Sequence, residues 1–398
     1  MTRLLAVLLA GAVCMPASGL AAGRSTDMVD GRTAKSRAIA TSVLPSVTMK
    51  AGLLSDGDGR IIWARKPGDR RSMASITKIM TAIVVLERSK LDESVVVPSG
   101  ASSVGESTAF LIAGEKLSAR DLLAAMLVQS GNDAATTLAL HVGGTEERFV
   151  QLMNQKAVEL GLKSTHFANP HGLDAPGQYS TAADLEVMSR YAMSKPEFRR
   201  IVRMKRATIG EPGNRHKLTS TDLLLGNYSG AIGIKTGSTD QAGYSVVSAA
   251  NRNGVTLYAI VLGTSSDPQR FRDAKELLDW GFAHYRPQSL ASSGTIVGQA
   301  PVSDYIDRSV PAAISQDASA TVLDLDGPIR RVVTIPSVKA PINAGDRVGS
   351  VAFTQDGKLI AGLPLVATED VSRPNPLLFV WIAMVRGWRA VFGALALG

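Results

Sequence analysis

The chain has 398 residues, of which 45% are hydrophobic and 20% are charged. That length is enough for more than one domain, and that composition is typical of a globular protein, which excludes a disordered or fibrous chain. The formal net charge of +8 favours anionic partners such as phospholipid or cell-wall polymer, but the basic residues are not interleaved with aromatic ones, so we expect no nucleic-acid partner.

Residues 1–22 have the layout of a secretory signal peptide. A positive charge at Arg3 precedes the short apolar run of residues 4–15, and small residues follow up to a predicted cleavage site after Ala21 or Ala22. The apolar run is too short to span a bilayer. We therefore expect an exported protein.

The only cysteine, Cys14, lies inside this segment, where Val13 stands in place of the small residue that a lipoprotein signal requires. The mature chain then has no cysteine, which excludes disulfides, thiol nucleophiles and cysteine-ligated zinc. The histidines are scattered and form no metal-binding motif, so we expect no metal site and no cofactor.

Residues 23–44 are polar and lack periodicity, so we interpret them as a flexible lead-in. A strand-like pattern begins at Ser46 and ends near Trp63, and the turn signal Asp56-Gly57-Asp58-Gly59 divides it. This arrangement predicts a β-hairpin.

The stretch Ser75-Ile76-Thr77-Lys78 begins a segment that is apolar on nearly every side, as far as Leu86. Such a pattern predicts a buried helix, and we expect Ser72 to be its N-cap. Ser75 and Lys78 would share one face, which places an amine beside a hydroxyl that needs a base. Burial and a nearby cation would lower the pKa of the amine and allow it to act as that base. The same spacing also arises by chance, so a polar first turn without chemistry is the alternative.

Helical patterns dominate from about Ser118 to Met193. One apolar face stops at Gln129-Ser130-Gly131-Asn132, and a new helix is predicted from Asn132 to the Gly143-Gly144 pair. Thr145 is expected to cap a further helix, and Ser180-Thr181 to begin another.

After Gly230 the pattern returns to strands, the first of which runs into Lys235-Thr236-Gly237. Residues 244–250 and 255–262 flank a turn, and residues 271–282 predict a closing helix. Strands at both ends with helices between them predict one antiparallel sheet covered by a helical region.

Residues 288–372 contain short β patterns separated by Gly, Pro and Asp, which predicts a small all-β domain that serves as a spacer or interaction module. The tail, residues 373–398, is about long enough to span a bilayer. Arg386 and Arg389 lie in its middle beside two tryptophans, which fits an interfacial helix better. A helix docked on the β domain is the alternative.

The Ser75–Lys78 spacing is a weak signal alone, but it becomes specific when two further motifs follow it in a fixed order. Ser130-Gly131-Asn132 begins 55 residues after Ser75, and Lys235-Thr236-Gly237 begins 103 residues after Asn132. With the Ser75–Lys78 pair they match the triplet of penicillin-binding proteins and serine β-lactamases. The stretches His171–Asp174 and Asp279–Phe282 make the chain resemble, over nearly its whole length, the D-alanyl-D-alanine carboxypeptidase family of low-molecular-mass penicillin-binding proteins.

This resemblance implies an α+β fold. A penicillin-recognising serine-transferase (β-lactamase-like) domain would occupy residues 45–287, the small all-β domain residues 288–372, and a C-terminal amphipathic membrane-anchor helix residues 373–398. The resemblance also implies a periplasmic enzyme, peripherally anchored to the outer face of the inner membrane. It would act in peptidoglycan maturation and cell-shape maintenance and be inhibited covalently by β-lactams.

The resemblance also implies the roles of the first two motifs. Ser75 would be the acyl-enzyme nucleophile and Lys78 its proton acceptor. Ser130 would relay a proton to the departing amine, and Asn132 would hold the peptide amide. His171 is interpreted as structural, a residue that orders its loop.

The third motif would bind the substrate. Lys235 and Thr236 would bind its terminal carboxylate, and Gly237 would let the strand edge approach it. The backbone N–H of Ser238 would complete the oxyanion hole with that of the nucleophile. Arg270 is expected to be either a second carboxylate contact or one half of an ion pair on the closing helix.

Four functions fit these residues. The leading hypothesis is a carboxypeptidase that removes the terminal D-alanine from peptidoglycan pentapeptide stems. A D,D-endopeptidase acting on cross-links would use the same residues. A β-lactamase is disfavoured because residues 165–177 contain no glutamate to activate water. A non-catalytic wall-binding scaffold is disfavoured by the intact triplet.

Overall fold

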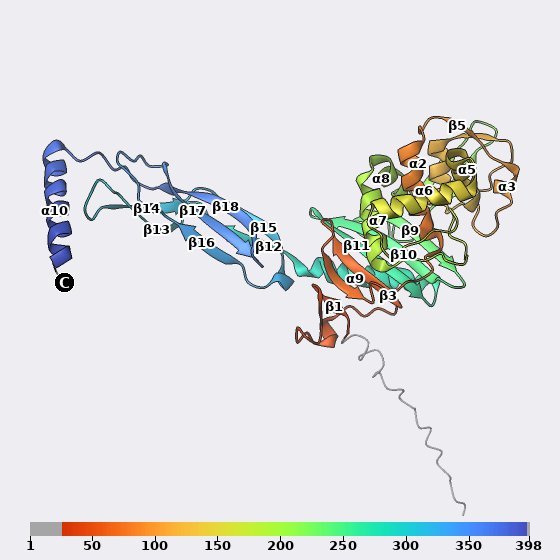
Figure 1. The fold of residues 1–398 in the computed structure, drawn as a ribbon, viewed down its shortest axis with the longest axis horizontal. Coiled ribbons are helices and arrows are strands. Elements are labelled where there is room, and N and C mark those ends of the chain that lie inside the picture. The colour runs from red at the N-terminus through yellow and green to blue at the C-terminus, as the bar shows by residue number, and fades with distance from the viewer. Residues whose placement is uncertain (1–25, 396–398) are drawn as a thin grey trace, which may run out of the picture. The chain divides into compact units, whose positions relative to one another are not determined.

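A computed structural model describes residues 26–395, which form two compact units, one ending at Phe282 and the other beginning at Ala283 (Figure 1). Each unit has its own core of buried apolar side chains. The predicted signal peptide, residues 1–22, lies outside the described residues.

An antiparallel sheet forms the base of the first unit, and its strands come from both ends of that unit's sequence. Their order is β2-β1-β4-β3-β11-β10-β9. The strands are β1 (Met28–Val29), β2 (Arg32–Thr33), β3 (Ala51–Asp56), β4 (Ile61–Arg65), β9 (Ala231–Thr239), β10 (Gly243–Arg252) and β11 (Val255–Thr264). The predicted mixed architecture is confirmed.

The segment between β4 and β9 is mainly helical. Its helices are η2 (Ala74–Thr77), α2 (Lys78–Arg88), α3 (Ser99–Ser102), α4 (Ala119–Val128), α5 (Asn132–Gly143), α6 (Glu146–Glu159), α7 (Ala182–Ser194) and α8 (Pro196–Val202). Its short strands are β5 (Ser94–Val96), β6 (Lys116–Ser118), β7 (Arg206–Ile209) and β8 (His216–Thr219). Thr145 caps α6 as predicted, and Thr181 caps α7, because each hydroxyl accepts a hydrogen bond from a backbone N–H of the first turn.

Helices cover both faces of the sheet (Figure 1). Successive residues of a strand point to opposite faces. Ser55 of β3 donates a hydrogen bond to Glu186 of α7. Its neighbour Leu54 packs against Gly281 of α9 (Asp267–His284). A Cβ at Gly281 would lie only 2.6 Å from Leu54 Cδ2. The closing helix and the central helical region therefore lie on opposite sides of β3.

Residues 26–44, which we expected to belong to a flexible lead-in, instead extend the sheet. β1 pairs with β4, and η1 (Thr41–Val43) follows it. Asp27 is buried, and its carboxylate accepts two hydrogen bonds from the Arg65 guanidinium, each 2.8 Å long. The few apolar residues of this segment gave no periodic signal because each strand is only two residues long.

Between its first residues and its last helix, the second unit consists of strands apart from one short 3₁₀ turn, and the predicted all-β domain is confirmed. It contains a five-stranded sheet, β13-β14-β18-β17-β16, and the pair β12-β15. The elements are β12 (Tyr285–Ala291), β13 (Ile296–Pro301), β14 (Ser309–Ile314), β15 (Ala318–Leu323), η3 (Asp324–Asp326), β16 (Arg330–Thr334), β17 (Arg347–Gln355) and β18 (Lys358–Ala367). We did not predict β12 and β14, each of which contains a proline, Pro287 or Pro311, that weakens a strand pattern.

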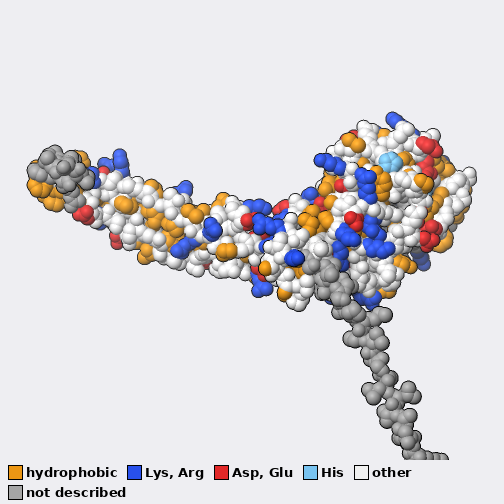
Figure 2. Space-filling model, turned by 60° about the horizontal axis from the view of Figure 1, so that its bottom comes forward, with side chains coloured by type: hydrophobic (Ala, Val, Ile, Leu, Met, Phe, Trp, Pro, Cys, Tyr) orange, Lys and Arg blue, Asp and Glu red, His pale blue; other side chains and the backbone are white. Residues whose placement is uncertain are grey.

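The tail forms helix α10 (Pro376–Leu395). Leu377, Trp381, Met384 and Trp388 share one helical face by their spacing, and each is more than half exposed. On another face Ile382 is buried and Arg386 donates a hydrogen bond to the Tyr305 carbonyl oxygen, 2.8 Å away. Figure 2 shows hydrophobic side chains, in orange, at the left end of the view where α10 lies. Among the described residues no helix is long and apolar enough to cross a membrane.

Candidate active site

Ser75 and Lys78 lie where the chain enters the buried helix α2. Ser75 belongs to the tight turn η2, and Lys78 is the first residue of α2. Lys78 Nζ lies 2.8 Å from Ser75 Oγ. The expected N-cap is wrong, because the Ser72 hydroxyl donates to Asp174 Oδ1 instead and the helix begins as a 3₁₀ turn without a side-chain cap.

The Lys78 side chain is fully buried and its amine has two further neighbours. Nζ lies 2.6 Å from Asn132 Oδ1 and 2.7 Å from the His171 carbonyl oxygen. Burial, and then the charge of Lys235, lower the pKa of Lys78 well below its usual value. A neutral amine can donate to these two oxygens and turn its lone pair toward the Ser75 hydroxyl, which is the arrangement that a general base requires.

Ser130 and Asn132 come from the sharp junction between α4 and α5. Ser130 has a φ of +67°, a left-handed conformation that non-glycine residues rarely adopt. This conformation turns the chain so that the Ser130 Oγ accepts a hydrogen bond of 2.8 Å from Lys235 Nζ. Asn132 Nδ2 meanwhile donates to the Gly105 carbonyl oxygen, 2.8 Å away.

Strand β9 brings the third motif to the same place. Lys235 is almost fully buried, and burial, followed by the charge of Arg270, lowers its pKa to about 7. The Thr236 hydroxyl lies 2.6 Å from the Thr221 hydroxyl, and Ser238 is exposed. Lys78 of α2 and Lys235 of β9 thus bring two buried amines, each with a lowered pKa, to the same site.

Gly237 is required by the close approach of β9 to η2. A Cβ at this position would lie 2.9 Å from the backbone nitrogen of Ser75 and 3.0 Å from the carbonyl oxygen of Met73. Any side chain would push the strand away from Ser75. This contact with η2 is a different close approach from the predicted one to the substrate, which stays a prediction.

Arg270, which had two possible roles, and His171, which we interpreted as structural, both contact neighbouring loops and strands. Arg270 Nη1 donates to the Gly237 carbonyl oxygen, 3.0 Å away, and the same guanidinium forms an ion pair with Asp267 on its own helix. The ring of His171 accepts a hydrogen bond from the Leu173 N–H through Nδ1. Burial, and then the charge of Lys78, lower the pKa of His171 to about 4, so the ring is neutral near pH 7.

Several contacts at this site were not predicted. The sequence gives no signal for backbone acceptors such as the Gly105 and His171 carbonyl oxygens. Thr221 and Asp222 lie in a polar run between strands, and nothing in that run distinguished them from a surface loop. Burial raises the pKa of Asp222 to about 6.

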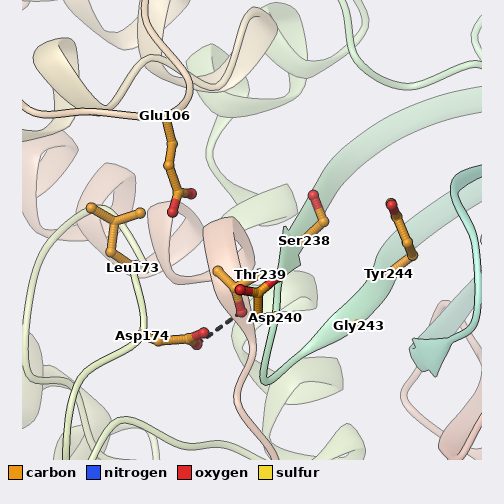
Figure 3. A pocket seen from close by; sticks show the side chains of 8 residues that line it. All are labelled: Glu106, Leu173, Asp174, Ser238, Thr239, Asp240, Gly243 and Tyr244. Atoms are coloured by element: carbon orange, nitrogen blue, oxygen red, sulfur yellow. Dashed lines mark hydrogen bonds between the residues drawn. The ribbon is translucent and has the colours of Figure 1, made fainter.

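A cavity of about 530 Å³ opens beside the exposed end of this constellation. Its lining residues are Glu106, Leu173, Asp174, Ser238, Thr239, Asp240, Gly243 and Tyr244. Figure 3 shows Glu106 pointing from its loop toward Asp174, with Ser238 and Tyr244 on the side of the strands. The constellation therefore combines the Ser75 hydroxyl, the neighbouring Lys78 amine, a second buried lysine and an open cleft, which are parts that acyl transfer from a negatively charged substrate could use.

Comparisons with known proteins agree with this chemistry. Residues 38–266 match the family model described as D-alanyl-D-alanine carboxypeptidase, and residues 285–373 match the model described as the C-terminal domain of penicillin-binding protein 5. The D-alanyl-D-alanine carboxypeptidase DacC of Escherichia coli is 32% identical over 398 residues, which cover 94% of this chain and 97% of that protein.

Two solved structures are also similar. Penicillin-binding protein 5 from Haemophilus influenzae is 30% identical, with a TM-score of 0.60, and the match covers 83% of this chain and 99% of that chain. The Streptomyces K15 DD-transpeptidase is 36% identical, with a TM-score of 0.57 over 60% of this chain and 98% of that one.

Proposed function

The chain belongs to the D-alanyl-D-alanine carboxypeptidase family of serine peptidases, and from this premise we propose that it removes the terminal D-alanine of peptidoglycan stem peptides through an acyl-enzyme on Ser75. The observation that carries the proposal is the contact of the Lys78 amine with the Ser75 hydroxyl, in a setting that disfavours the charge on Lys78.

Acylation begins when Ser75 Oγ attacks the carbonyl carbon between the two D-alanines and Lys78 Nζ takes the hydroxyl proton. The backbone N–H groups of Ser75 and Ser238 stabilise the negative charge that develops on the carbonyl oxygen. The C–N bond then breaks, and the proton returns to the departing amine through Ser130 Oγ. Water hydrolyses the remaining ester and releases the shortened peptide.

Lys235 selects substrates that end in a free carboxylate. Lys235→Ala is expected to weaken acylation by peptide and penicillin together, because both carry a carboxylate at the matching place. A charged hydrogen bond contributes about 1.5–3 kcal/mol, so kcat/KM should fall by about one to two powers of ten. Lys235→Arg should retain more activity because it keeps the charge while changing the geometry.

The measurement compares kcat/KM for a peptide acid and its C-terminal amide in both proteins, with the exposed strand residue Lys217 changed to Ala as the matched control. The amide should be a poor substrate of the wild type and should lose little more in Lys235→Ala. Equal losses for acid and amide would contradict the role of Lys235 as carboxylate anchor and would point to an effect through Lys78.

We further propose that the enzyme is exported to the periplasm and held at the outer face of the inner membrane by α10. The exposed apolar face of that helix, with Leu377, Trp381 and Met384, supports insertion into the interfacial layer of a bilayer. The contact of Arg386 with the β domain leaves this face uncovered among the described residues.

Deleting residues 376–398 is expected to release an active, soluble enzyme, because the proposed catalytic residues all lie in the first unit. A finer test is the double variant Trp381→Glu with Met384→Glu, compared with Leu359→Glu, a matched change of an exposed apolar residue on β18. Vesicle co-sedimentation should fall only in the double variant. If the truncated protein stays in the membrane fraction, the anchor lies elsewhere.

A further inference from the structure

Asp222 is a buried carboxylate that the chemistry described above does not use. It lies between β8 and β9, and 6% of the residue is exposed. One of its oxygens, Oδ1, accepts a hydrogen bond of 2.9 Å from the backbone N–H of Leu224. The other, Oδ2, is buried and makes no hydrogen bond with any residue that the structure describes. Burying such a charge is unfavourable unless positive charge nearby offsets it.

Hydrogen bonds fix the segment of Asp222 against the strand that carries Lys235. The backbone N–H of Thr221 donates to the carbonyl oxygen of Val128, the last residue of α4, over 3.2 Å. The Thr221 hydroxyl lies 2.6 Å from the hydroxyl of Thr236, the residue after Lys235. Asp222 therefore directly follows a residue that contacts both α4 and β9.

Two buried cations lie at the same part of β9. Lys235 belongs to the strand, and the Arg270 guanidinium donates to the carbonyl oxygen of Gly237 over 3.0 Å. Arg270 has an ion-pair partner, Asp267. Among the described residues, Lys235 Nζ contacts a hydroxyl and a backbone carbonyl oxygen, both uncharged, and forms no ion pair. The buried charge of Lys235 therefore has no carboxylate in contact to offset it.

The charges around Lys235 act on it in opposite directions. Burial lowers the pKa of Lys235 most and the charge of Arg270 lowers it further, whereas the charge of Asp222 raises it. Burial raises the pKa of Asp222 itself to about 6, so this carboxylate is ionised where Lys235, with a pKa of about 7, loses its proton. The other titratable groups around these three residues are Lys78, Tyr244 and Asp267.

We propose that Asp222 is a positioning residue that keeps Lys235 charged, so that the amine can bind the terminal carboxylate of the substrate. The inference rests on the proposed function and adds a residue to its carboxylate-binding site. A carboxylate in direct contact with Lys235 would compete with the substrate for the amine. Asp222, held by the N–H of Leu224, forms no ion pair with Lys235 and so offsets the cost of burial while leaving the amine free.

The test measures the rate constant of acylation by penicillin, and kcat/KM for the peptide acid, as functions of pH. Asp222→Asn keeps the acceptor for the Leu224 N–H but removes the charge, so the pKa of Lys235 should fall. The limb on which rates decline as Lys235 loses its proton should move to lower pH by about one unit, the lower end of the shift that a nearby opposite charge produces. Well below pH 6, where Asp222 is protonated in the wild type too, both proteins should react equally fast.

Further variants separate the charge from the structure. Asp58→Asn, which changes an exposed carboxylate on the turn between β3 and β4, is the matched control and should leave the limb in place. In Lys235→Arg the guanidinium stays charged without help, so adding Asp222→Asn should not move the limb. Asp222→Ser removes the same charge with a smaller side chain and should shift the limb as Asp222→Asn does.

Three results would overturn the inference and leave the proposed function intact. They are a loss of rate that is equal at every pH, a limb that does not move, and failure of both Asp222 variants to fold, which would assign Asp222 to the fold alone. If the unmodified protein reacted with neither the peptide nor penicillin, the proposed function and this inference would both be overturned.

Discussion

Ser75→Ala is expected to abolish both D-alanine release and covalent labelling by penicillin. No other serine among the described residues has a buried lysine amine with a lowered pKa at hydrogen-bond distance from its hydroxyl on the same turn. Removing the nucleophile of a serine peptidase lowers kcat by about 10⁶-fold. The substituted side chain loses one oxygen at a half-buried site, so the fold should be unaffected.

The measurement is D-alanine release from a pentapeptide stem, with a thermal melting curve on the same sample. Ser99→Ala, which changes an exposed serine at the start of α3, is the matched control and should be fully active. Retained penicillin labelling of Ser75→Ala with an unchanged melting curve would remove Ser75 from its assigned role.

Lys78→Arg is expected to be nearly inactive. The general base must be neutral, and burial, with the charge of Lys235 second, lowers the pKa of Lys78 toward that state. A guanidinium stays protonated in proteins and cannot accept the Ser75 proton. The loss should exceed about 10²-fold, the lower range for removal of a general base.

The pH dependence follows from the two lysines. Activity rises as Lys78 loses its proton, so the ascending limb of kcat/KM reports the lowered pKa of Lys78. Carboxylate binding needs the charged form of Lys235, whose pKa of about 7 places the descending limb near neutral pH. Because the two groups interact, the limbs report the titration of the pair.

The variants separate the two limbs. In Lys235→Arg the descending limb should move to higher pH, since the guanidinium keeps its charge. Lys90→Arg, an exposed lysine just beyond α2, should leave both limbs in place. Turnover by Lys78→Arg comparable to the wild type would require a different base.

The contact between Ser75 and Lys78 could be predicted because it depends on local geometry. Residues three apart lie on one face of both a 3₁₀ helix and an α-helix, so Ser75 and Lys78 come into contact in either case. The wrong prediction of Ser72 as N-cap therefore did not change the prediction of this contact. The sheet could also be predicted, because long apolar strands such as β11 have a strong signal. That the three motifs meet at one site could be expected only from the resemblance of the triplet to a known family.

The parts of the site that could not be predicted depend on backbone atoms and on residues far apart in sequence. The contacts of Asn132 with Gly105 and Ser107 are of this kind, because a carbonyl oxygen has no sequence signature. Glu106 looked like any loop glutamate, and only the fold shows that its neighbours are tied to the catalytic centre. The strands at residues 26–44 were missed for a related reason, since the short β1 depends on its pairing with β4.

The central claim is that Ser75 becomes acylated, and the mass spectrum of the penicillin-treated full chain tests it most directly. The account predicts a gain equal to the mass of one intact penicillin molecule, since the β-lactam ring opens on acylation without losing atoms. After proteolysis the added mass should map to the peptide that contains Ser75. An unmodified chain, or an adduct on any other residue, would contradict the account.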